Sequence, residues 1–255
     1  MAVSRPEVTL SVVIMAHPKR EAMVAQLIQK LDCPEPLVVW DRWGDRWDTG
    51  RRAMLAYDID CTHHLVIQDD VVVCRDLVAG FARAIAAADE GVPISGYIGR
   101  LRPAQDRVRT AVGAARSGGA SFITTDCLYW GPAIAVPTDR ILEMVGHCDP
   151  LRSIQNYDRR MSCYWESRGI RTWSTWPSLV DHADGLSLVA GRIKTNHKTH
   201  SRVAHQFLGE SRSALDLDWR GPVVHAQYPP TITRSPTRKT RAPYYRHPAE
   251  VEVHR

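Results

Sequence analysis

The fold of this chain is decided by the stretch His64-Leu65-Val66-Ile67-Gln68-Asp69-Asp70-Val71-Val72-Val73. It is a run of β-forming apolar residues that two adjacent carboxylates interrupt. Burying an unpaired carboxylate is costly, and α/β sheets bind ligands at the carboxyl ends of their strands. Asp69 and Asp70 are therefore expected at a strand end, where two carboxylates suit a hard divalent cation with a phosphate-bearing ligand. The alternative is an acidic turn that caps the following element.

Strands and helices alternate around this stretch. Apolar residues form continuous, strand-like runs in some segments and recur at helical spacing in others. The expected strands are Leu10–Ala16, 36–40, 65–68, 94–98 and 170–176. The expected helices are 20–31, a helix that Asp48-Thr49 caps, 76–88, 139–145 and 154–168. Thr138 is expected to cap the helix 139–145, and Gly169 to end the helix 154–168. This alternation predicts an α/β fold with a mostly parallel, Rossmann-like sheet flanked by helices.

Three segments depart from this alternation. Residues 99–120 contain five arginines and little apolar periodicity, which favours a mobile, lid-like loop. Residues 121–136 predict one or two strands, with a break at Trp130-Gly131-Pro132. Residues 221–255 contain six prolines and few aliphatic side chains, which indicates an extended or disordered tail. The expected organisation is therefore one domain over residues 1–220, followed by the tail.

Charge and cysteine usage restrict the class of protein. The formal net charge is +5, but residues 221–255 hold six Lys/Arg against two Glu, so the preceding part is almost neutral. A nucleic-acid partner is therefore not expected. The six cysteines form no C-x-x-C pair, which is typical of reduced core residues. No apolar run is long enough to cross a bilayer and the first residues lack a signal-peptide pattern, so a cytoplasmic protein is expected.

The order of these motifs resembles that of GT-A glycosyltransferases over roughly residues 9 to 209. The resemblance rests on the polar loop His17-Pro18-Lys19-Arg20 after the first strand, on Asp41 after the second and on Gln68-Asp69-Asp70 as a variant of the D-x-D signature. It also rests on Pro177-Ser178-Leu179-Val180-Asp181-His182, which looks like a family segment whose histidine completes the metal site. The family has an acid where Gln68 stands, so one carboxylate is missing here. The short chain looks more like bacterial or phage-encoded members, which implies the host cytoplasm for a phage enzyme.

The resemblance implies a metal-dependent transfer of a sugar from a nucleoside-diphosphate sugar (a UDP- or GDP-sugar) to a hydroxyl acceptor on a protein or glycan. Asp70 and His182 would hold Mn²⁺ or Mg²⁺, and a histidine among carboxylates is compatible with Mn²⁺. The cation would neutralise the diphosphate as it leaves. Asp69 would reach the donor ribose or a metal-bound water. For His182 the alternative role is the capping of a turn.

The same resemblance implies a set of donor-binding residues: His17, Arg20, Asp41, Arg51, Asp69, Trp130, Gly131 and Arg202. Arg51 or its neighbour Arg52 would lie beside the phosphates, because guanidinium groups match phosphate oxygens. Arg202 belongs to the basic stretch 192–205, which could fold over the diphosphate, with Lys194, His200 or Arg202 supplying charge, or simply be solvated surface. Trp130 could form a platform for a sugar ring or pack as a buried strand residue. Asp41 could instead cap a loop, and Trp43 or Trp47 could stack on the base or pack ordinarily.

Asp158 is the expected catalytic base, because family members with inverting chemistry often place a carboxylate at the start of such a helix. Its alternative role is to interact favourably with the helix dipole, and Asp126 and Asp149 are further candidates. Inversion by direct displacement is the expected stereochemistry. Two other functions stay open. One is a sugar nucleotidyltransferase, although the 17–20 loop lacks the glycines of a phosphate-binding loop, and the other is a non-enzymatic binder that uses the arginine-rich loop and basic tail.

Overall fold

The computed structural model of the chain describes residues 7–100, 105–183 and 202–226. Their centre is an eight-stranded sheet in the order β10-β6-β8-β5-β7-β3-β1-β2. The strands are β1 (Leu10–Ala16), β2 (Leu37–Trp40), β3 (His63–Gln68), β5 (Ile94–Ser95), β6 (Phe122–Thr125), β7 (Ala133–Pro137), β8 (Thr172–Thr175) and β10 (Val223–His225). The pairings give β1, β2, β3, β5 and β8 one direction and β6, β7 and β10 the other. The sheet is therefore mixed, with its longest parallel stretch at β2-β1-β3.

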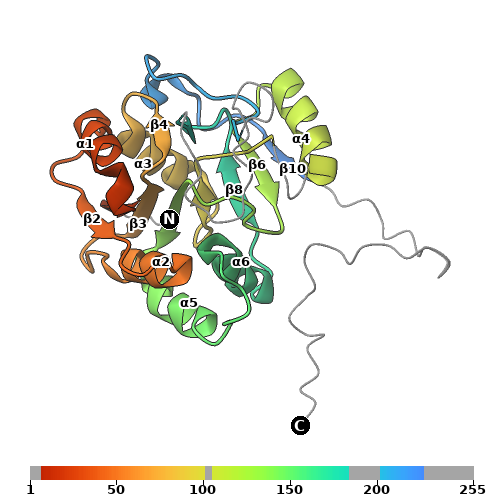
Figure 1. Cartoon of the computed structure of the whole chain (residues 1–255). Helices are drawn as coiled ribbons and strands as arrows, with labels where there is room; N and C mark the ends of the chain where they lie inside the picture. Colours follow the sequence, from red (N-terminus) through yellow and green to blue (C-terminus); the bar gives the residue numbers. More distant parts are fainter. Residues whose placement is uncertain (1–6, 101–104, 184–201, 227–255) are drawn as a thin grey trace, which may run out of the picture.

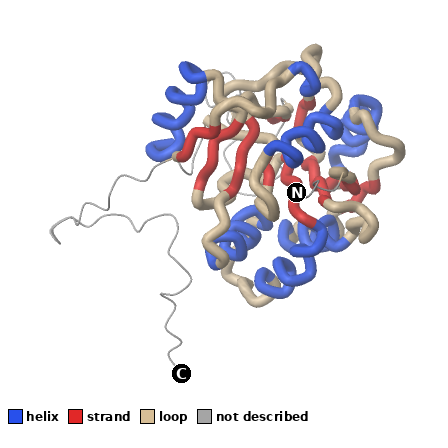
Figure 2. The backbone as a smooth tube through the Cα atoms, turned by 180° about the vertical axis from the view of Figure 1, so that it is seen from behind, coloured by secondary structure: helices blue, strands red, loops and turns tan. Residues whose placement is uncertain are grey.

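Helices cover both faces of this sheet (Figures 1 and 2). Figure 1 shows α1 and α3 above the sheet and α2, α5 and α6 below it, while α4 lies beside β6 and β10. The helices are α1 (Glu21–Lys30), α2 (Arg46–Leu55), α3 (Leu77–Ala87), α4 (Gln105–Gly118), α5 (Ile141–Cys148) and α6 (Tyr157–Ser167), with short 3-10 turns at Pro18–Arg20, Thr138–Arg140 and Ala214–Asp216. The predicted α/β fold with a mostly parallel sheet between helices is confirmed at this level.

The alternation of side chains along the central strands explains the two-sided core. Ile14 of β1 packs in the cluster with α1 and α3, whereas its neighbour Val13 packs in the cluster with α2, α5 and α6. Successive side chains of a strand point to opposite faces, so a run of apolar residues such as Leu65-Val66-Ile67 is buried on both sides. Burial on both sides explains why the strand within residues 64–73 is continuously apolar instead of alternating between apolar and polar residues.

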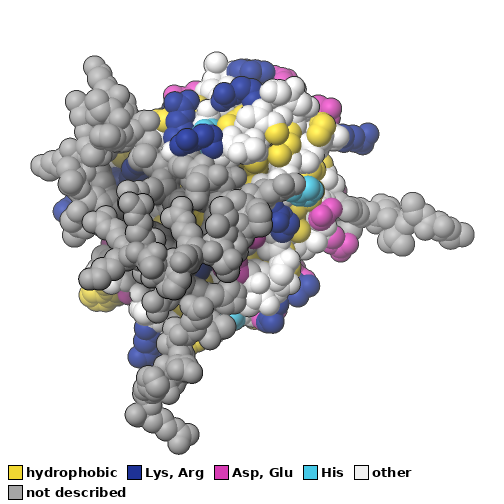
Figure 3. Space-filling view, turned by 90° about the vertical axis from the view of Figure 1, so that its right-hand side faces the viewer, with side chains coloured by type: hydrophobic (Ala, Val, Ile, Leu, Met, Phe, Trp, Pro, Cys, Tyr) yellow, Lys and Arg dark blue, Asp and Glu magenta, His cyan; other side chains and the backbone are white. Residues whose placement is uncertain are grey.

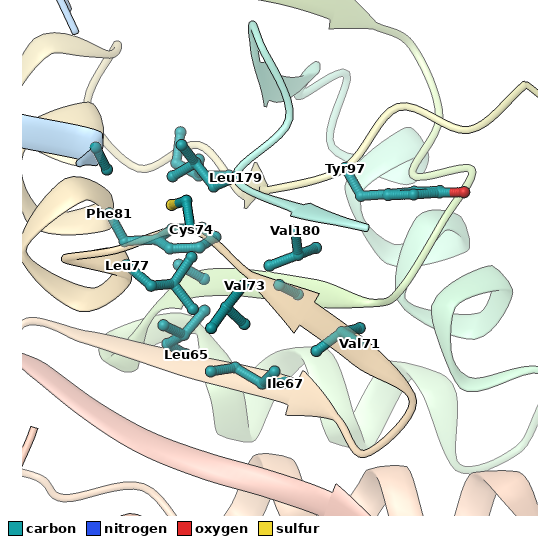
Figure 4. Packing of buried hydrophobic residues seen from close by; sticks show 14 of the residues in the cluster. Leu65, Ile67, Val71, Val73, Cys74, Leu77, Phe81, Tyr97, Leu179 and Val180 are labelled. Carbon is teal, nitrogen blue, oxygen red and sulfur yellow. The ribbon is translucent and has the colours of Figure 1, made fainter. Parts of the chain in front are cut away.

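A separate two-stranded sheet pairs β4 (Val71–Val73) with β9 (Val180–His182). Figure 4 shows Val71 and Val73 packed between Leu65 and Ile67 of β3 and the Leu179-Val180 segment. The last three residues of the segment 177–182 form β9, a strand that the sequence analysis did not predict. The antiparallel register places Val71 opposite His182, so this small sheet brings together the two motifs on which the metal prediction depends.

The prediction of a loop over residues 99–120 is wrong, because α4 occupies Gln105–Gly118. Val108, Ala111, Val112 and Ala115 are buried in a third apolar cluster with Ile98, Ile123 and Trp176. These four residues have helical spacing, but the charged and glycine residues between them dilute that signal. Residues 101–104 lie outside the described residues.

Two boundaries also differ from the expectation. β10 lies past residue 220 and pairs in parallel with β6, so the sheet includes residues 223–225 of the expected tail, whose remainder from 227 lies outside the described residues. Helix α2 is capped by Asp45, whose Oδ1 accepts from the backbone N–H groups of Trp47 and Asp48, and not by Asp48-Thr49. By contrast, Gly169 has a φ of 65°, as expected of a left-handed residue that ends a helix.

Two expectations drawn from composition can be compared with the described residues. All six cysteines are free; Cys74, Cys148 and Cys163 are buried as expected of core residues, whereas Cys33, Cys61 and Cys127 are half-buried. Among the residues that the structure describes, no helix has the length and apolar character needed to cross a membrane.

Candidate active site at the carboxyl ends of the strands

Polar side chains gather where β1, β2 and β3 end. His17 follows β1, Asp41 follows β2, and Asp69 and Asp70 follow β3. The backbone N–H of Asp41 donates to Ala16 O at 2.6 Å and that of Asp69 donates to Met15 O at 3.1 Å, so both acids continue the hydrogen bonding of the sheet. Because the three strands are parallel neighbours, acids that are far apart in the sequence share one edge of the sheet.

Asp69 holds the loop after β1. Its Oδ2 accepts from the backbone N–H of His17 at 2.7 Å, and its Oδ1 accepts from Arg20 Nη1 at 2.7 Å. Burial raises the pKa of Asp69, and these two contacts act in the opposite direction. Both carboxylate oxygens therefore have partners within the protein. The structure gives Asp69 a positioning role toward Arg20, and its expected role toward a donor ribose stays a prediction.

Asp70 is the centre of the site. Its Oδ2 lies 3.2 Å from Arg20 Nη1 and 3.7 Å from Arg202 Nη1, and its Oδ1 lies 3.7 Å from His182 Nδ1. Burial acts to raise the pKa of Asp70, but the proximity of His182 and the charges of Arg20 and Arg202 together hold it well below its usual range. A buried carboxylate that stays ionised amid cationic groups is suited to bind a cation or to orient the arginines.

His182 Nδ1 is buried and has no hydrogen-bond partner among the described residues. The 3.7 Å to Asp70 Oδ1 is too long for a hydrogen bond, but two metal–ligand bonds together span about 4.2 Å. One cation could therefore contact both atoms, and the pair fits the expected Mn²⁺ or Mg²⁺. The described residues contain no group of three or more His, Cys, Asp or Glu side chains that could hold a metal, so phosphate and water oxygens would complete its coordination.

Asp181 and Tyr97 are site residues that the sequence analysis did not assign. Asp181 Oδ1 accepts from the backbone N–H groups of His182 and Ala204, both at 2.8 Å. The Tyr97 hydroxyl donates to Arg202 O at 2.8 Å, and its ring meets the His182 ring edge-on at 5.3 Å. These two side chains connect β9 to the segment that carries Arg202. Sequence spacing could not reveal them, because every one of these contacts except that between Asp181 and its neighbour His182 spans more than 20 residues.

Asp41 and His17 form a second group beside the carboxylates. Asp41 accepts from Gly44 N and from Thr49 Oγ1, the latter at 2.7 Å, and its Oδ2 lies 3.8 Å from His17 Nε2. The Asp41 carboxylate thus orders the loop that leads into α2, which is the alternative role expected for it. In the same loop Trp43 is 80% exposed, whereas Trp47, in the first turn of α2, is buried and donates to Asp149 Oδ1.

Tyr157 joins three parts of the site that the sequence separates. Its buried hydroxyl donates to Gly131 O and accepts from Gln68 Nε2 at 3.4 Å. A Cβ at Gly131 would lie 2.5 Å from that hydroxyl and 3.0 Å from Asp158 Cβ. The structure therefore brings Gly131 and Asp158 together, close to the end of β3. Trp130 is half-buried and meets the Tyr97 ring edge-on at 6.2 Å.

Arg51 is not brought into this group. Its Nε lies 2.9 Å from Asp149 Oδ1 and 3.1 Å from Oδ2. Arg52 pairs with Asp48 one helical turn away and donates to Trp40 O. Both arginines thus have carboxylate partners on or near α2, and the expected phosphate contact of Arg51 has no support in the described contacts. Lys194 and His200 lie outside the described residues.

A cleft of about 320 Å³ lies at the other end of the sheet. It is formed where β5 and β8 begin, and it is lined by Asp89, Glu90, Gly91, Val92, Thr124, Gly169, Ile170, Arg171, Trp173 and His225. None of the expected site residues lines it. The concentration of buried charge at the carboxyl ends is therefore the better guide to chemistry than this cleft.

No protein-family model matches the chain, and no curated protein matches it either.

Proposed function

We propose that the protein is a metal-dependent glycosyltransferase of the GT-A type, which moves a sugar from a nucleoside-diphosphate sugar to a hydroxyl acceptor. The observation that carries the proposal is the pair formed by Asp70 and the unpartnered His182 Nδ1, which face each other across 3.7 Å at the end of β3. A donor diphosphate would add oxygen ligands to the cation, and Arg20 and Arg202 would add positive charge.

Each residue of the site has a part in the proposed reaction. Arg20 and Arg202 bind the diphosphate, and Asp69 orients Arg20 through the 2.7 Å contact with its Nη1. In the proposed complex Asp41 accepts a hydrogen bond from the nucleoside, and Trp43, which is exposed in the same loop, is free to stack on the base. When bound, the divalent cation supplies charge that stabilises the departing diphosphate. Because imidazole is among the ligands, we favour Mn²⁺ over Mg²⁺.

Asp158 is the proposed base. It lies at the start of α6 and against Gly131, one residue from the Tyr157 that contacts Gln68. In this role its carboxylate takes the proton of the acceptor hydroxyl while that oxygen attacks the anomeric carbon and the diphosphate leaves from the opposite side. This direct displacement inverts the configuration of the sugar.

The roles of Asp70 and His182 as metal ligands are tested with the purified chain, Mn²⁺ and a panel of UDP-, GDP- and dTDP-sugars. The release of free nucleotide is measured. We expect Asp70→Asn to lower turnover by about two orders of magnitude and His182→Ala to raise the Mn²⁺ concentration needed. The matched control is Asp139→Asn, because Asp139 is 75% exposed on the 3-10 turn before α5. Turnover by Asp70→Asn at the wild-type rate would refute the proposal.

The base is tested by separating donor hydrolysis from transfer. We expect Asp158→Asn to lower transfer to an acceptor hydroxyl by about two orders of magnitude or more, with release of nucleotide to water less affected. Because the amide is isosteric with the carboxylate, circular dichroism should show no change in fold. Transfer at a near-normal rate would assign the base to another residue.

A further inference from the structure

Three arginines and one histidine gather on the side of the molecule that carries α4. We call Arg100, Arg109, Arg116 and His205 the arginine cluster. The three arginine side chains are exposed, and among the carboxylates that the structure describes none forms an ion pair with them. Figure 3 looks onto this side, and Lys and Arg side chains gather on it above the grey atoms.

The fold brings these residues together from three segments. The backbone N–H of Arg100 donates to Val203 O at 2.9 Å, and that of His205 donates to Ile98 O at 2.8 Å. Arg100 Nη2 also donates to His205 O at 3.3 Å. Helix α4 buries Val108 and Ala115 against Ile98, so its Arg109 and Arg116, seven residues apart, share the side next to this pair of segments. Their Cα atoms are separated by about 10 Å along the helix.

The positive charges of the three arginines all act on the imidazole ring of His205. Burial lowers the pKa of His205, and Arg100, Arg116 and Arg109 lower it further. The three guanidinium groups therefore form a concentration of like charge, although Arg100 also interacts with the carboxylate of Asp181. Such an arrangement is unfavourable on its own and becomes favourable when an anion enters it.

The cluster is continuous with the proposed active site. Arg100 follows the segment of Tyr97, whose hydroxyl contacts Arg202 O, and Arg202 in turn lies 3.7 Å from Asp70. A Cβ at Gly99 would lie 3.0 Å from Trp130 Nε1. Tyr97 and Trp130 thus separate the cluster from the carboxylates, which are the place for the donor diphosphate. A ligand on the cluster would therefore lie on the other side of Tyr97 and Trp130 from the place proposed for the donor diphosphate.

We propose that the arginine cluster binds phosphate groups of the acceptor, and that this acceptor is a glycan or polyol chain joined through phosphodiesters. The proposal rests on the proposed function. Guanidinium groups pair with phosphate oxygens through two parallel hydrogen bonds, and the helical spacing of Arg109 and Arg116 suits a chain with more than one phosphate. A single-stranded nucleic acid would favour exposed aromatic rings for base stacking. The exposed large apolar residues of the described part are Ile28, Leu37, Trp43, Ile59 and Leu142, none of which belongs to the cluster.

The test uses the full chain without divalent cations, and inorganic tripolyphosphate as the probe. Binding is measured by calorimetry, and the His205 ring is followed by NMR. We expect the double variant Arg109→Gln/Arg116→Gln to bind tripolyphosphate about tenfold more weakly than the wild type. In the wild type, the bound anion should raise the pKa of His205. The matched control is Arg152→Gln/Arg212→Gln, which removes the same charge from two exposed arginines elsewhere.

The outcomes separate this proposal from its rivals. Equal weakening in both double variants, or a His205 resonance that does not respond, would overturn it. Cluster-dependent binding of oligothymidylate about tenfold tighter than tripolyphosphate would point to a nucleic acid instead. The cluster variant should keep the wild-type rate of donor hydrolysis, because its residues do not contact the carboxylates. Unaltered donor hydrolysis by Asp70→Asn would count against the proposed function alone, since anion binding by the cluster has its own readouts.

Discussion

At Gly131 a single hydrogen atom in place of a methyl group lets three segments meet. Its carbonyl accepts from the Tyr157 hydroxyl, and any Cβ would lie 2.5 Å from that oxygen, which is closer than real Cβ contacts. Tyr157 is fully enclosed between Gln68 and this glycine, so it cannot move aside without breaking both contacts. The close approach, and not backbone flexibility, explains the glycine.

We therefore expect Gly131→Ala to destabilise the protein by about 1–3 kcal/mol and to lower donor turnover, because Asp158 and Gln68 would shift. Urea denaturation measures the first effect and nucleotide release the second. Gly146→Ala is the matched control: Gly146 lies in α5, and a Cβ there meets nothing within 4 Å. The control should be neutral or stabilising by up to about 1 kcal/mol. A Gly131→Ala protein as stable as the control would show that the contact relaxes without cost.

Single residues also show how far sequence reasoning reaches. The acids at 41, 69 and 70 could be placed at strand ends because apolar runs precede them directly, and the structure puts them at one edge of the sheet. The approach of His182 to Asp70 was expected only from a family resemblance. The contact of Arg51 with Asp149 could not be predicted, because its partner is 98 residues away. The local pattern of apolar and polar residues predicts where a residue lies along its own helix or strand. It does not predict which side chains from other elements contact that residue.

On the scale of elements, length decides what can be predicted. The seven residues of β1 form a clear apolar run, and the prediction matched its bounds. Strands β9 and β10 have three residues each, too few for a pattern, and they form only because β4 and β6 offer free edges. Helix α4 carried the required apolar spacing, but charged residues and glycines between the apolar positions obscured it.

The short β10 gives a test of where the folded unit ends. We expect a chain that stops after residue 220 to be less stable than one that stops after residue 226, by about 2 kcal/mol or more. The shorter chain loses the pairing of β10 with β6, the buried Ala226 and the 3.0 Å contact of Arg171 Nη2 with Ala226 O. Thermal unfolding of the two chains compares them directly. Equal unfolding temperatures for the two chains would place the end of the folded unit at residue 220, as the composition predicted.

On the scale of the whole molecule, buried ionisable groups link stability to pH. His64 of β3 is fully buried, with Nδ1 at 2.7 Å from Ser11 Oγ and Nε2 at 2.8 Å from Ala53 O. Because a carbonyl can only accept, Nε2 carries the proton of the neutral ring and Nδ1 accepts from Ser11. Burial lowers the pKa of His64 from 6.5 to about 4, although the carbonyl of Ala53 and the backbone of Ser11 act to raise it.

A lowered histidine pKa means that the unfolded chain binds the proton more tightly than the folded one. The stability that His64 contributes is therefore intact above about pH 6.5 and is lost as the pH falls toward 4, by roughly 3 kcal/mol in total. Urea denaturation at several pH values should show this loss on top of that from other groups. His64→Asn keeps a donor and an acceptor but does not titrate, so its stability should fall less steeply between pH 6.5 and 4. Equal slopes for both proteins would contradict the assignment.

Arg20 contacts Asp69 and Asp70 at once, at 2.7 and 3.2 Å. A guanidinium therefore already supplies the compensating charge that two enclosed acids need, so the polypeptide can reach its native state before any ion arrives. A divalent cation that binds there would compete with the guanidinium of Arg20 for the two carboxylates. Under the proposed function, this competition would weaken the binding of the cation alone. The diphosphate, to which both the cation and Arg20 could bind, would then complete the site.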